Sequence, residues 1–405
     1  MAPSCLTVLA PIRPGEDAAL RSVLGAIGDD IKGSRLPAGS GRPRIDFPRS
    51  RHIHFARFAI LDDPDRGPGR SRLLYASVYD GTLSDHLAEL ADITSNLDAI
   101  WGPCEGFSGA RSFPAFISAH AHEPEAYYIA FREETVASIR HAISIRPQTT
   151  SSEPPLARGF ARQVADALKR LVRAAPVVLD MLRAVARLGF TNVYAGVSGI
   201  TASLDRYAII RLMNRITHNR MPPRASPFSS VVLDNCAAPV PFAPGDEFPS
   251  ALASVPATFR EDVIAQNQLT LVTVVDEGRV DRLRAVMSAI DAYARRLSPP
   301  GSLTGISTIH FVRWLLIDNG RRLLFVSDYD NSWENYIDEF AEMILSGLDA
   351  IWGTALGFPP DGARDLPAFK RFLRCHQIPS EAFFSAYPDE TVLNIAADTA
   401  RARQG

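Results

Sequence analysis

Two stretches of the chain show the same alternation of hydrophobic and polar residues, and each predicts a β-hairpin. The clearer one is residues 308–330, and the other is residues 52–80 with a Pro/Gly/Arg-rich turn at 64–71. The two stretches align residue by residue, so that four polar positions recur: His54 with His310, Arg57 with Arg313, Tyr79 with Tyr329 and Asp80 with Asp330. This recurrence indicates an internal duplication.

The elements around each hairpin also recur in the same order. Apolar spacing of three and four residues predicts helices, and runs of β-branched and aromatic residues predict strands. In the first copy we predict a strand at 5–12, a helix at 16–28, the hairpin, a helix from Thr82 to 102, and a strand at 125–131. In the second copy we predict a strand at 268–275, a helix at 279–297, the hairpin, a helix from Ser332 to 353, and a strand at 381–387.

Both hairpins are followed by a helix that ends in the same six residues, Leu-Asp-Ala-Ile-Trp-Gly, at 97–102 and 348–353. The apolar residues suit the last turn of a helix packed on a sheet. Gly102 and Gly353 suit the position after the helix, where a positive φ angle favours glycine. We therefore interpret the motif as a structural helix stop.

The order β-α-β-β-α-β in each copy predicts an α+β fold made of two ferredoxin-like repeats. Such a unit leaves one face of its sheet bare, and two units can cover both faces by packing sheet to sheet. We place the first repeat at 1–145 and the second at 266–405. Residues 146–265 form a linker and a basic amphipathic helical insertion between them.

Composition narrows the functional classes. The chain is 46% hydrophobic and 22% charged, with a net charge of −2, so no overall attraction to nucleic acid is expected. The four cysteines lie far apart, which argues against a zinc site or a disulfide framework. The start of the chain resembles a first strand rather than a signal peptide, and no apolar run reaches spanning length. A reduced, cytoplasmic location follows by default.

The insertion is the one strongly basic region. From Arg158 to Arg224 there are twelve Lys/Arg against three aspartates. Residues 159–190 have an apolar side flanked by arginines, which is typical of three situations: a solvated charged helix face, a helix lying on a membrane surface, or a lid over a barrel opening. No basic-aromatic pattern accompanies the charge, so nucleic acid is not an expected partner.

Arg57 and Arg313 lie in the middle of apolar strands. Alternation places Arg313 on the opposite face of strand 310–317 from His310. A buried cation needs an anion, so we expect either a structural ion pair, with Asp80, Asp330 or the acidic pair at 389–390, or a bound carboxylate, propionate or peroxide-derived oxygen.

Two pairs of histidines recur, His54 with His310 and His120 with His376. Each could be a core histidine satisfied by hydrogen bonds. His376 follows the apolar Phe372 and Leu373 at helical spacing, which makes it the best single candidate for a metal or haem ligand. The alternative for His376 is a helix-capping role.

The duplicated arrangement resembles the dimeric α+β barrel superfamily, and in particular its haem-dependent members, such as dye-decolourising peroxidases and chlorite dismutases. Residues 77–81, Ser-Val-Tyr-Asp-Gly, are similar to the Gly-x-x-Asp-Gly motif of the peroxidases, with serine replacing the first glycine. The resemblance implies haem with His376 as its proximal ligand and Asp80 as a distal acid/base. It implies that Arg57 or Arg313 stabilises a cleaving O–O bond.

By the internal match, Asp330 joins these catalytic candidates, and His310 and Tyr329 join His376 as cofactor-binding candidates. Three functional hypotheses follow. The first is a haem-binding, peroxidase-like oxidoreductase acting on an apolar or lipid-like substrate. The second is a cofactor-free barrel that binds a small acid or lipid and touches membranes through 159–190. The third is a non-catalytic scaffold.

Overall fold

The computed structural model describes residues 3–33, 43–146 and 265–404, apart from residues 64, 65, 68 and 297. The predicted insertion at 146–265 therefore lies almost wholly outside the described residues. The strands are β1 (Ser4–Pro11), β2 (Ile53–Asp62), β3 (Ser71–Tyr79), β4 (Ala126–Ile129), β5 (Gln266–Val274), β6 (Ile309–Ile317), β7 (Arg322–Asp330) and β8 (Ser380–Ser385). The main helices are α1 (Asp17–Gly33), α2 (Leu83–Ile93), α3 (Leu97–Trp101), α4 (Phe113–Ala119), α5 (Val136–Ser144), α11 (Val280–Arg296), α12 (Trp333–Trp352), α13 (Leu366–His376) and α14 (Val392–Ala402).

The fold is α+β, as predicted, with two four-stranded antiparallel sheets in the orders β1-β3-β2-β8 and β4-β6-β7-β5. The last strand of each copy is exchanged, because β4 pairs with β6 of the second copy and β8 pairs with β2 of the first. This corrects the prediction of two self-contained ferredoxin-like sheets. Each half of the chain supplies one edge strand to the other half.

The chain crosses between the sheets just before each exchanged strand. Leu9 donates its N–H to the carbonyl of His120 at 3.0 Å, and His122 donates to Thr7 at 2.8 Å, so this segment first bonds to β1 and then enters the other sheet as β4. Ile378 likewise donates to Thr270 of β5 at 2.9 Å before β8 begins. The strands nevertheless form two open sheets rather than the single closed barrel that the resemblance implies.

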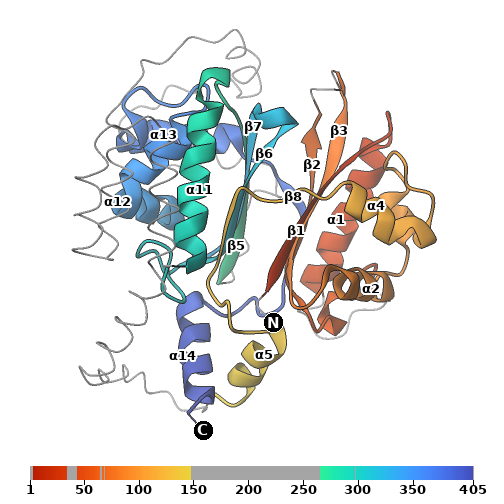
Figure 1. Cartoon of the computed structure of the whole chain (residues 1–405). Helices are drawn as coiled ribbons and strands as arrows, with labels where there is room; N and C mark the ends of the chain where they lie inside the picture. Colours follow the sequence, from red (N-terminus) through yellow and green to blue (C-terminus); the bar gives the residue numbers. More distant parts are fainter. Residues whose placement is uncertain are drawn as a thin grey trace.

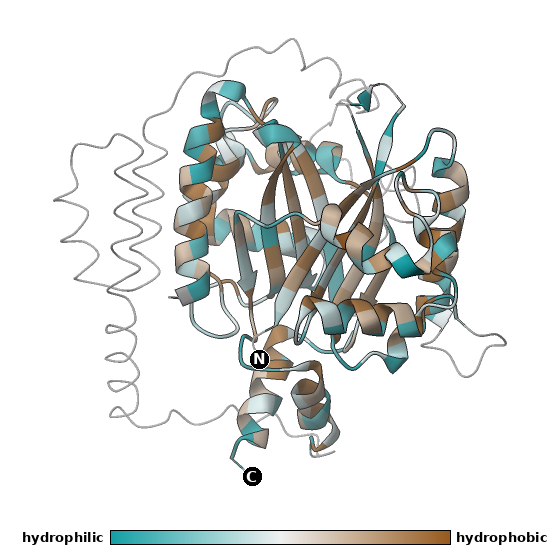
Figure 2. Ribbon diagram, turned by 45° about the vertical axis from the view of Figure 1, so that its right-hand side comes forward, coloured by the Kyte–Doolittle hydropathy of each residue, from teal (hydrophilic) through white to brown (hydrophobic). Residues whose placement is uncertain are grey.

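The sheets face each other, and helices cover their outer faces (Figure 1). The layer between the sheets contains a small aliphatic cluster with five residues from each sheet: Leu9, Ala59, Leu61, Leu74, Ala76, Val272, Leu315, Ile317, Leu324 and Val326. Two larger clusters join each sheet to its own helices. Figure 2 shows hydrophobic residues along the strands and hydrophilic residues on the outer helix surfaces, the pattern that burial of apolar area favours.

One helix in each copy is attached to its sheet through a matched contact. His86 of α2 stacks on Tyr79 at 4.1 Å between ring centres, and its Nε2 lies 2.9 Å from Oγ of Ser77. At the matching position, Tyr336 of α12 stacks on Tyr329 at 3.9 Å, and its hydroxyl lies 2.6 Å from Oγ of Ser327. Tyr329 therefore faces the helix layer.

The glycine that ends the repeated six-residue motif is required, but not for the predicted reason. Gly102 has φ −54° and Gly353 has φ −61°, so the expected positive φ is wrong at both positions. A Cβ on either glycine would lie 2.2 Å from the carbonyl oxygen four residues earlier, on Asp98 or Asp349. Close approach of the backbone therefore explains the glycines.

The helix predicted from Thr82 to 102 is two helices, α2 and α3. Its start is as predicted, because Oγ1 of Thr82 accepts the N–H of Asp85 at 3.1 Å. In the second copy α12 is continuous but contains one non-helical residue, Ile344, with φ −139° and ψ 38°. Both copies thus interrupt this helix at the corresponding place.

The burial of His86 predicts that the stability of the protein depends on pH. Burial lowers the pKa of His86 to about 3, below the 6.5 of an unfolded histidine. The folded state then binds fewer protons than the unfolded state, so His86 makes the protein less stable as the pH falls below 6.5. His86→Tyr copies the residue of the second repeat and removes this titration. We expect the loss of unfolding free energy between pH 7 and pH 5 to be smaller in the variant by about 2 kcal/mol, measured by urea denaturation.

The matched control is Tyr336→Phe, which alters the corresponding contact without removing a titrating group in this range. An unchanged pH dependence in His86→Tyr would contradict the assignment.

Candidate functional site

Both hairpins contain a one-residue bulge at their histidine. The pairing of β2 with β3 shifts between Ile53 and Phe55, and that of β6 with β7 shifts between Ile309 and Phe311. His54 and His310 are therefore left out of the ladders. Their rings approach the opposite sheet: His54 lies 5.8 Å from Phe311, and His310 lies 5.5 Å from Phe55. The prediction that histidine and arginine point to opposite sides is wrong, because simple alternation fails at a bulge.

Arg57 reaches from the first sheet into the second. One of its terminal nitrogens, Nη1, donates to the carbonyl of Leu269 at 2.9 Å and to Oγ1 of Thr270 at 3.1 Å. The other, Nη2, donates to the carbonyl of Ser327 at 2.8 Å and forms an ion pair with Asp328. The predicted structural ion pair exists, but its acid is neither Asp80, Asp330 nor the acidic pair at 389–390.

Arg313 makes the reciprocal contacts from the second sheet into the first. It donates to the carbonyl of Leu6 at 2.8 Å, to Oγ1 of Thr7 at 3.1 Å and to the carbonyl of Ser77 at 3.1 Å. The counterpart of Asp328 here is Val78, so among the described residues Arg313 has no carboxylate within ion-pair distance. Neutral oxygens satisfy this buried guanidinium.

Asp328 forms the ion pair with Arg57 and also interacts electrostatically with Arg313. Burial raises the pKa of its carboxyl group, and the positive charges of Arg57 and Arg313 oppose that rise. Burial also lowers the pKa of Arg57, while Asp328 opposes that change. Desolvation is the largest influence on both partners, so their ion pair forms at a considerable cost in solvation free energy.

Each of the two predicted aspartates hydrogen-bonds to the histidine of its own hairpin and to the start of the last helix in its half of the chain. These end helices are α5 and α14. Asp80 Oδ1 lies 3.0 Å from His54 Nε2, and its Oδ2 accepts the N–H of Val136 at the start of α5 at 2.8 Å. Asp330 repeats this with His310 at 2.7 Å and with Val392 at the start of α14 at 2.8 Å. Both oxygens of each carboxylate are engaged, and a negative charge at a helix start is stabilising.

The hydrogen bonding of the second ring nitrogen, Nδ1, differs between His54 and His310. With Nε2 donating to Asp80, Nδ1 of a neutral His54 accepts the O–H of Tyr387, 2.7 Å away. The residue matching Tyr387 is Phe131, whose ring lies 6.3 Å from that of His310. His310 Nδ1 is buried and has no hydrogen-bond partner within the part of the chain that the structure describes. Burial and the nearby Asp80 and Asp328 raise the pKa of Tyr387 well above its usual value.

The predicted haem residues do not form one site. His376 is at the end of α13, in the helix layer outside the second sheet, whereas the predicted arginines and aspartates lie between the sheets (Figure 1). Tyr329 faces the same helix layer as His376 but stacks on Tyr336. The predicted distal groups therefore do not fit a haem bound at His376.

His376 itself has the hydrogen bonding of an axial ligand. Its Nδ1 lies 2.7 Å from the carbonyl oxygen of Phe372, and its buried Nε2 has no hydrogen-bond partner in residues 3–33, 43–146 and 265–404 as described. Burial lowers the pKa of the ring, which keeps it neutral at pH 7. His120 makes the same contact with Phe116 at 2.9 Å, as a helix-capping histidine would. The hydrogen bond of Nδ1 is thus consistent with an axial ligand and with a helix-capping histidine.

No cluster of three or more His, Cys, Asp or Glu side chains suited to a metal ion is found within the described ranges. Cys5 and Cys104 are free thiols. Cys375 takes part in a disulfide bond, which the wide spacing of the cysteines gave no reason to expect.

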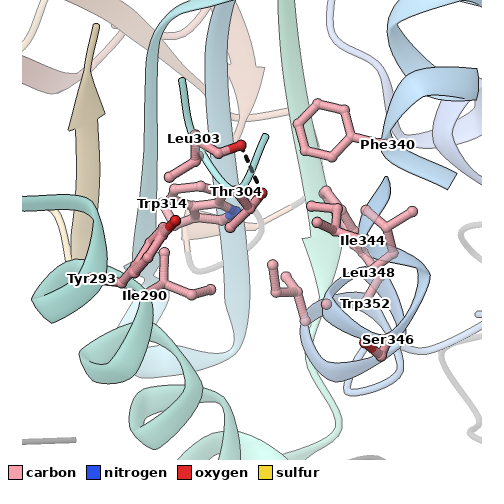
Figure 3. A pocket seen from close by; sticks show the side chains of 12 residues that line it. Ile290, Tyr293, Leu303, Thr304, Trp314, Phe340, Ile344, Ser346, Leu348 and Trp352 are labelled. Atoms are coloured by element: carbon pink, nitrogen blue, oxygen red, sulfur yellow. Dashed lines mark hydrogen bonds between the residues drawn. The ribbon is translucent and has the colours of Figure 1, made fainter. Parts of the chain in front are cut away.

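A pocket lies behind the second sheet, between α11, α12 and the turn before β6 (Figure 3). It contains about 590 Å³ of space free of atoms, part of it open to solvent. Its lining is almost entirely apolar: Ile290, Tyr293, Leu303, Thr304, Trp314, Phe340, Ile344, Ser346, Gly347, Leu348, Ile351 and Trp352. The interruption of α12 at Ile344 lies in this wall.

Two observations concern the polar atoms and the backbone of the pocket wall. The ring nitrogens of Trp314 and Trp352 are buried, and neither has a hydrogen-bond partner among the described residues. Leu303 and Ile306 exchange two backbone hydrogen bonds of 2.9 Å around Thr304 and Gly305, which have φ angles of 55° and 98°. A β-branched threonine is strained in this left-handed conformation, and such strain is concentrated at functional sites.

Sequence reasoning missed several of these residues. Asp328, Tyr387 and Trp314 stand opposite Val78, Phe131 and Phe58 in the duplicated alignment. Each is a place where the second copy gains a polar group that the first copy lacks. Such differences between the copies are the signal that could have found them.

In comparisons with known proteins, no family model, no curated protein and no solved structure matches the chain. Within the described ranges, no helix combines the length and apolar composition needed to cross a membrane.

The histidine difference predicts opposite effects of two exchanges. Tyr387→Phe leaves His54 Nδ1 buried without a partner, and we expect a loss of about 1–3 kcal/mol in unfolding free energy. Phe131→Tyr offers His310 the missing donor, and we expect a stability equal to or above that of the wild type. Urea denaturation measures both. Equal losses in the two variants would show that ring packing, rather than the hydrogen bond, decides stability here.

Proposed function

We propose that the protein binds a small, predominantly apolar molecule, without a cofactor, in the pocket between α11, α12 and the second sheet. The observation that carries this proposal is a pocket whose lining is almost entirely apolar and, among the described residues, contains no charged side chain. Pockets of this kind are the usual sites of small ligands.

The charged residues between the sheets support the choice of this pocket as the binding site, because they have structural roles. The side chains of Arg57, Asp80 and Asp330 are held by hydrogen bonds within the protein, as is the guanidinium group of Arg313. They join the sheets and hold the end helices. The matched contacts of the two halves further support an origin by duplication of a ferredoxin-like unit, modified by strand exchange.

The test uses an uncharged fluorescent apolar probe, N-phenyl-1-naphthylamine, with the full-length protein. Ile344→Trp places a larger side chain in the pocket wall, and we expect it to weaken probe binding by about tenfold or more. The control is Leu393→Trp, because Leu393 is exposed on α14 and does not line the pocket. Probe emission and urea denaturation are measured for both variants. No binding to the wild type, or equal weakening in both variants, would refute the proposal.

A second candidate is a haem site that uses His376 as its axial ligand. The unpaired, neutral Nε2 of His376 favours it, since ligating histidines commonly donate their other nitrogen to a backbone carbonyl. Bound haem would supply redox chemistry, and His376 would orient it. No further residue of the chain is assigned to this group.

An absorption spectrum tests the haem candidate. Haem added to the purified protein is expected to give a Soret band distinct from that of free haem, and His376→Ala is expected to abolish it. His120→Ala is the matched control, because His120 makes the same bond to a carbonyl at the corresponding place. A spectrum identical to free haem, or one unaffected by His376→Ala, would reject this candidate.

Binding to membranes through residues 159–190 and a scaffold role stay predictions. The first depends on a segment outside the described residues, and no contact among the described residues bears on the second.

A further inference from the structure

We infer that the tight turn at Thr304 and Gly305 is a lid that opens to admit a ligand to the pocket between α11, α12 and the second sheet. This inference rests on the proposed function and adds the route by which a ligand enters. Leu303 and Thr304 belong to the pocket lining (Figure 3), whereas Gly305 is exposed and does not line it. The turn thus faces the pocket on one side and solvent on the other.

The side chains that line the pocket are almost completely buried. Trp314, Phe340 and Trp352 have 2%, 4% and 3% of their surface exposed. A bound small molecule contacts its pocket over most of its own surface. It can reach such buried side chains only after part of the wall has moved aside, so binding requires the pocket to open.

The turn is the part of the wall that can move with the least disruption. Leu303 and Ile306 exchange two backbone hydrogen bonds of 2.9 Å with each other, and Oγ1 of Thr304 donates to the carbonyl of Leu303 at 2.7 Å. All three bonds lie within the turn. Among the described residues, neither Thr304 nor Gly305 forms a hydrogen bond to α11 or α12. The turn can therefore change conformation while both helices keep their own bonds.

The backbone of the closed turn is strained. Thr304 and Gly305 have φ angles of 55° and 98°, as in a type I′ turn, which favours Asn-Gly at these two positions. A β-branched side chain is poorly suited to a positive φ. The other described non-glycine residues with positive φ are of the types that tolerate it: Asp318, Asn319 and Asn331. Strain in the closed state lowers the free energy needed to leave it.

The experiment uses two substitutions that change this strain in opposite directions. Thr304→Asn introduces a residue that tolerates a positive φ, and Gly305→Ala adds a Cβ where φ is 98°. Stopped-flow mixing of the full-length proteins with N-phenyl-1-naphthylamine gives the association and dissociation rate constants. We expect both constants to fall about fivefold in Thr304→Asn and to rise about fivefold in Gly305→Ala. The Kd should stay within about twofold of the wild type, because the strain is present in the free and the bound closed state alike.

The matched control is Thr304→Val, which keeps the β-branched shape and removes the hydroxyl group. We expect its rate constants to stay within about twofold of the wild type. Hydrogen exchange of the Leu303 and Ile306 amides reports the opening of the turn without the probe. We expect this exchange to be slower in Thr304→Asn and faster in Gly305→Ala. If Gly305→Ala fails to fold in urea denaturation, Thr304→Asn still tests the lid, because it relieves strain.

The outcomes separate the lid from the proposed function. Unchanged rate constants and amide exchange in the folded variants would overturn the lid while keeping the pocket, and would move the entry to the interruption of α12 at Ile344. A changed Kd with an unchanged association rate constant would also overturn the lid, because it would show that the turn acts only as a wall. Failure of the probe to bind the wild type would refute the proposed function, and the lid with it.

Discussion

The burial of two arginines between the sheets is the constraint on which the rest of the structure depends. A guanidinium group cannot lose its hydration without other acceptors, so each sheet must present oxygens to the arginine of the opposite sheet. Arg57 finds the carbonyls of Leu269 and Ser327, and Arg313 finds those of Leu6 and Ser77. These contacts require the two hairpins to face each other in one register. Breaking one would leave a buried charge uncompensated, typically at a cost of about 3–5 kcal/mol.

The exchanged strands and the end helices follow from this arrangement. Because β4 and β8 cross to the opposite sheet, each half continues to α5 or α14 from the far side. Asp80 and Asp330 then tie these helices back to the hairpins of their own halves through Val136 and Val392. The same carboxylates hold His54 and His310 at the bulges. Residues that resemble an acid/base site in the sequence thus connect the hairpins to the end helices.

The differences between the halves matter more for function than their likeness. Symmetric positions carry contacts that both halves need, such as the stacking of His86 and Tyr336 on their strands. Asymmetric positions are free to serve one site. Trp314 stands in the pocket wall at the position of Phe58 in the first half, and Thr304, with a φ angle of 55°, also lines this wall. The pocket that they line lies behind the second sheet and away from the buried charges, so ligand binding there need not disturb the contacts between the sheets.

The sequence by itself determined the α+β class, the eight strands, the helices that follow β1, β3, β5 and β7, and the N-cap at Thr82, because these depend on local periodicity and spacing. For the central arginines it left open a structural ion pair or a bound anion, and Arg57 forms such an ion pair whereas Arg313 bonds to neutral oxygens. It did not determine the partner, Asp328, nor the side on which the histidines lie, because a bulge reverses the alternation beyond it. Only the tertiary structure decided that the last strands are exchanged and that His376 lies apart from Asp80 and Arg57. It also decided that the ring nitrogen of Trp314 is buried with no hydrogen-bond partner among the described residues. These features depend on which surfaces meet after folding, and contacts between residues distant in the chain determine which surfaces meet.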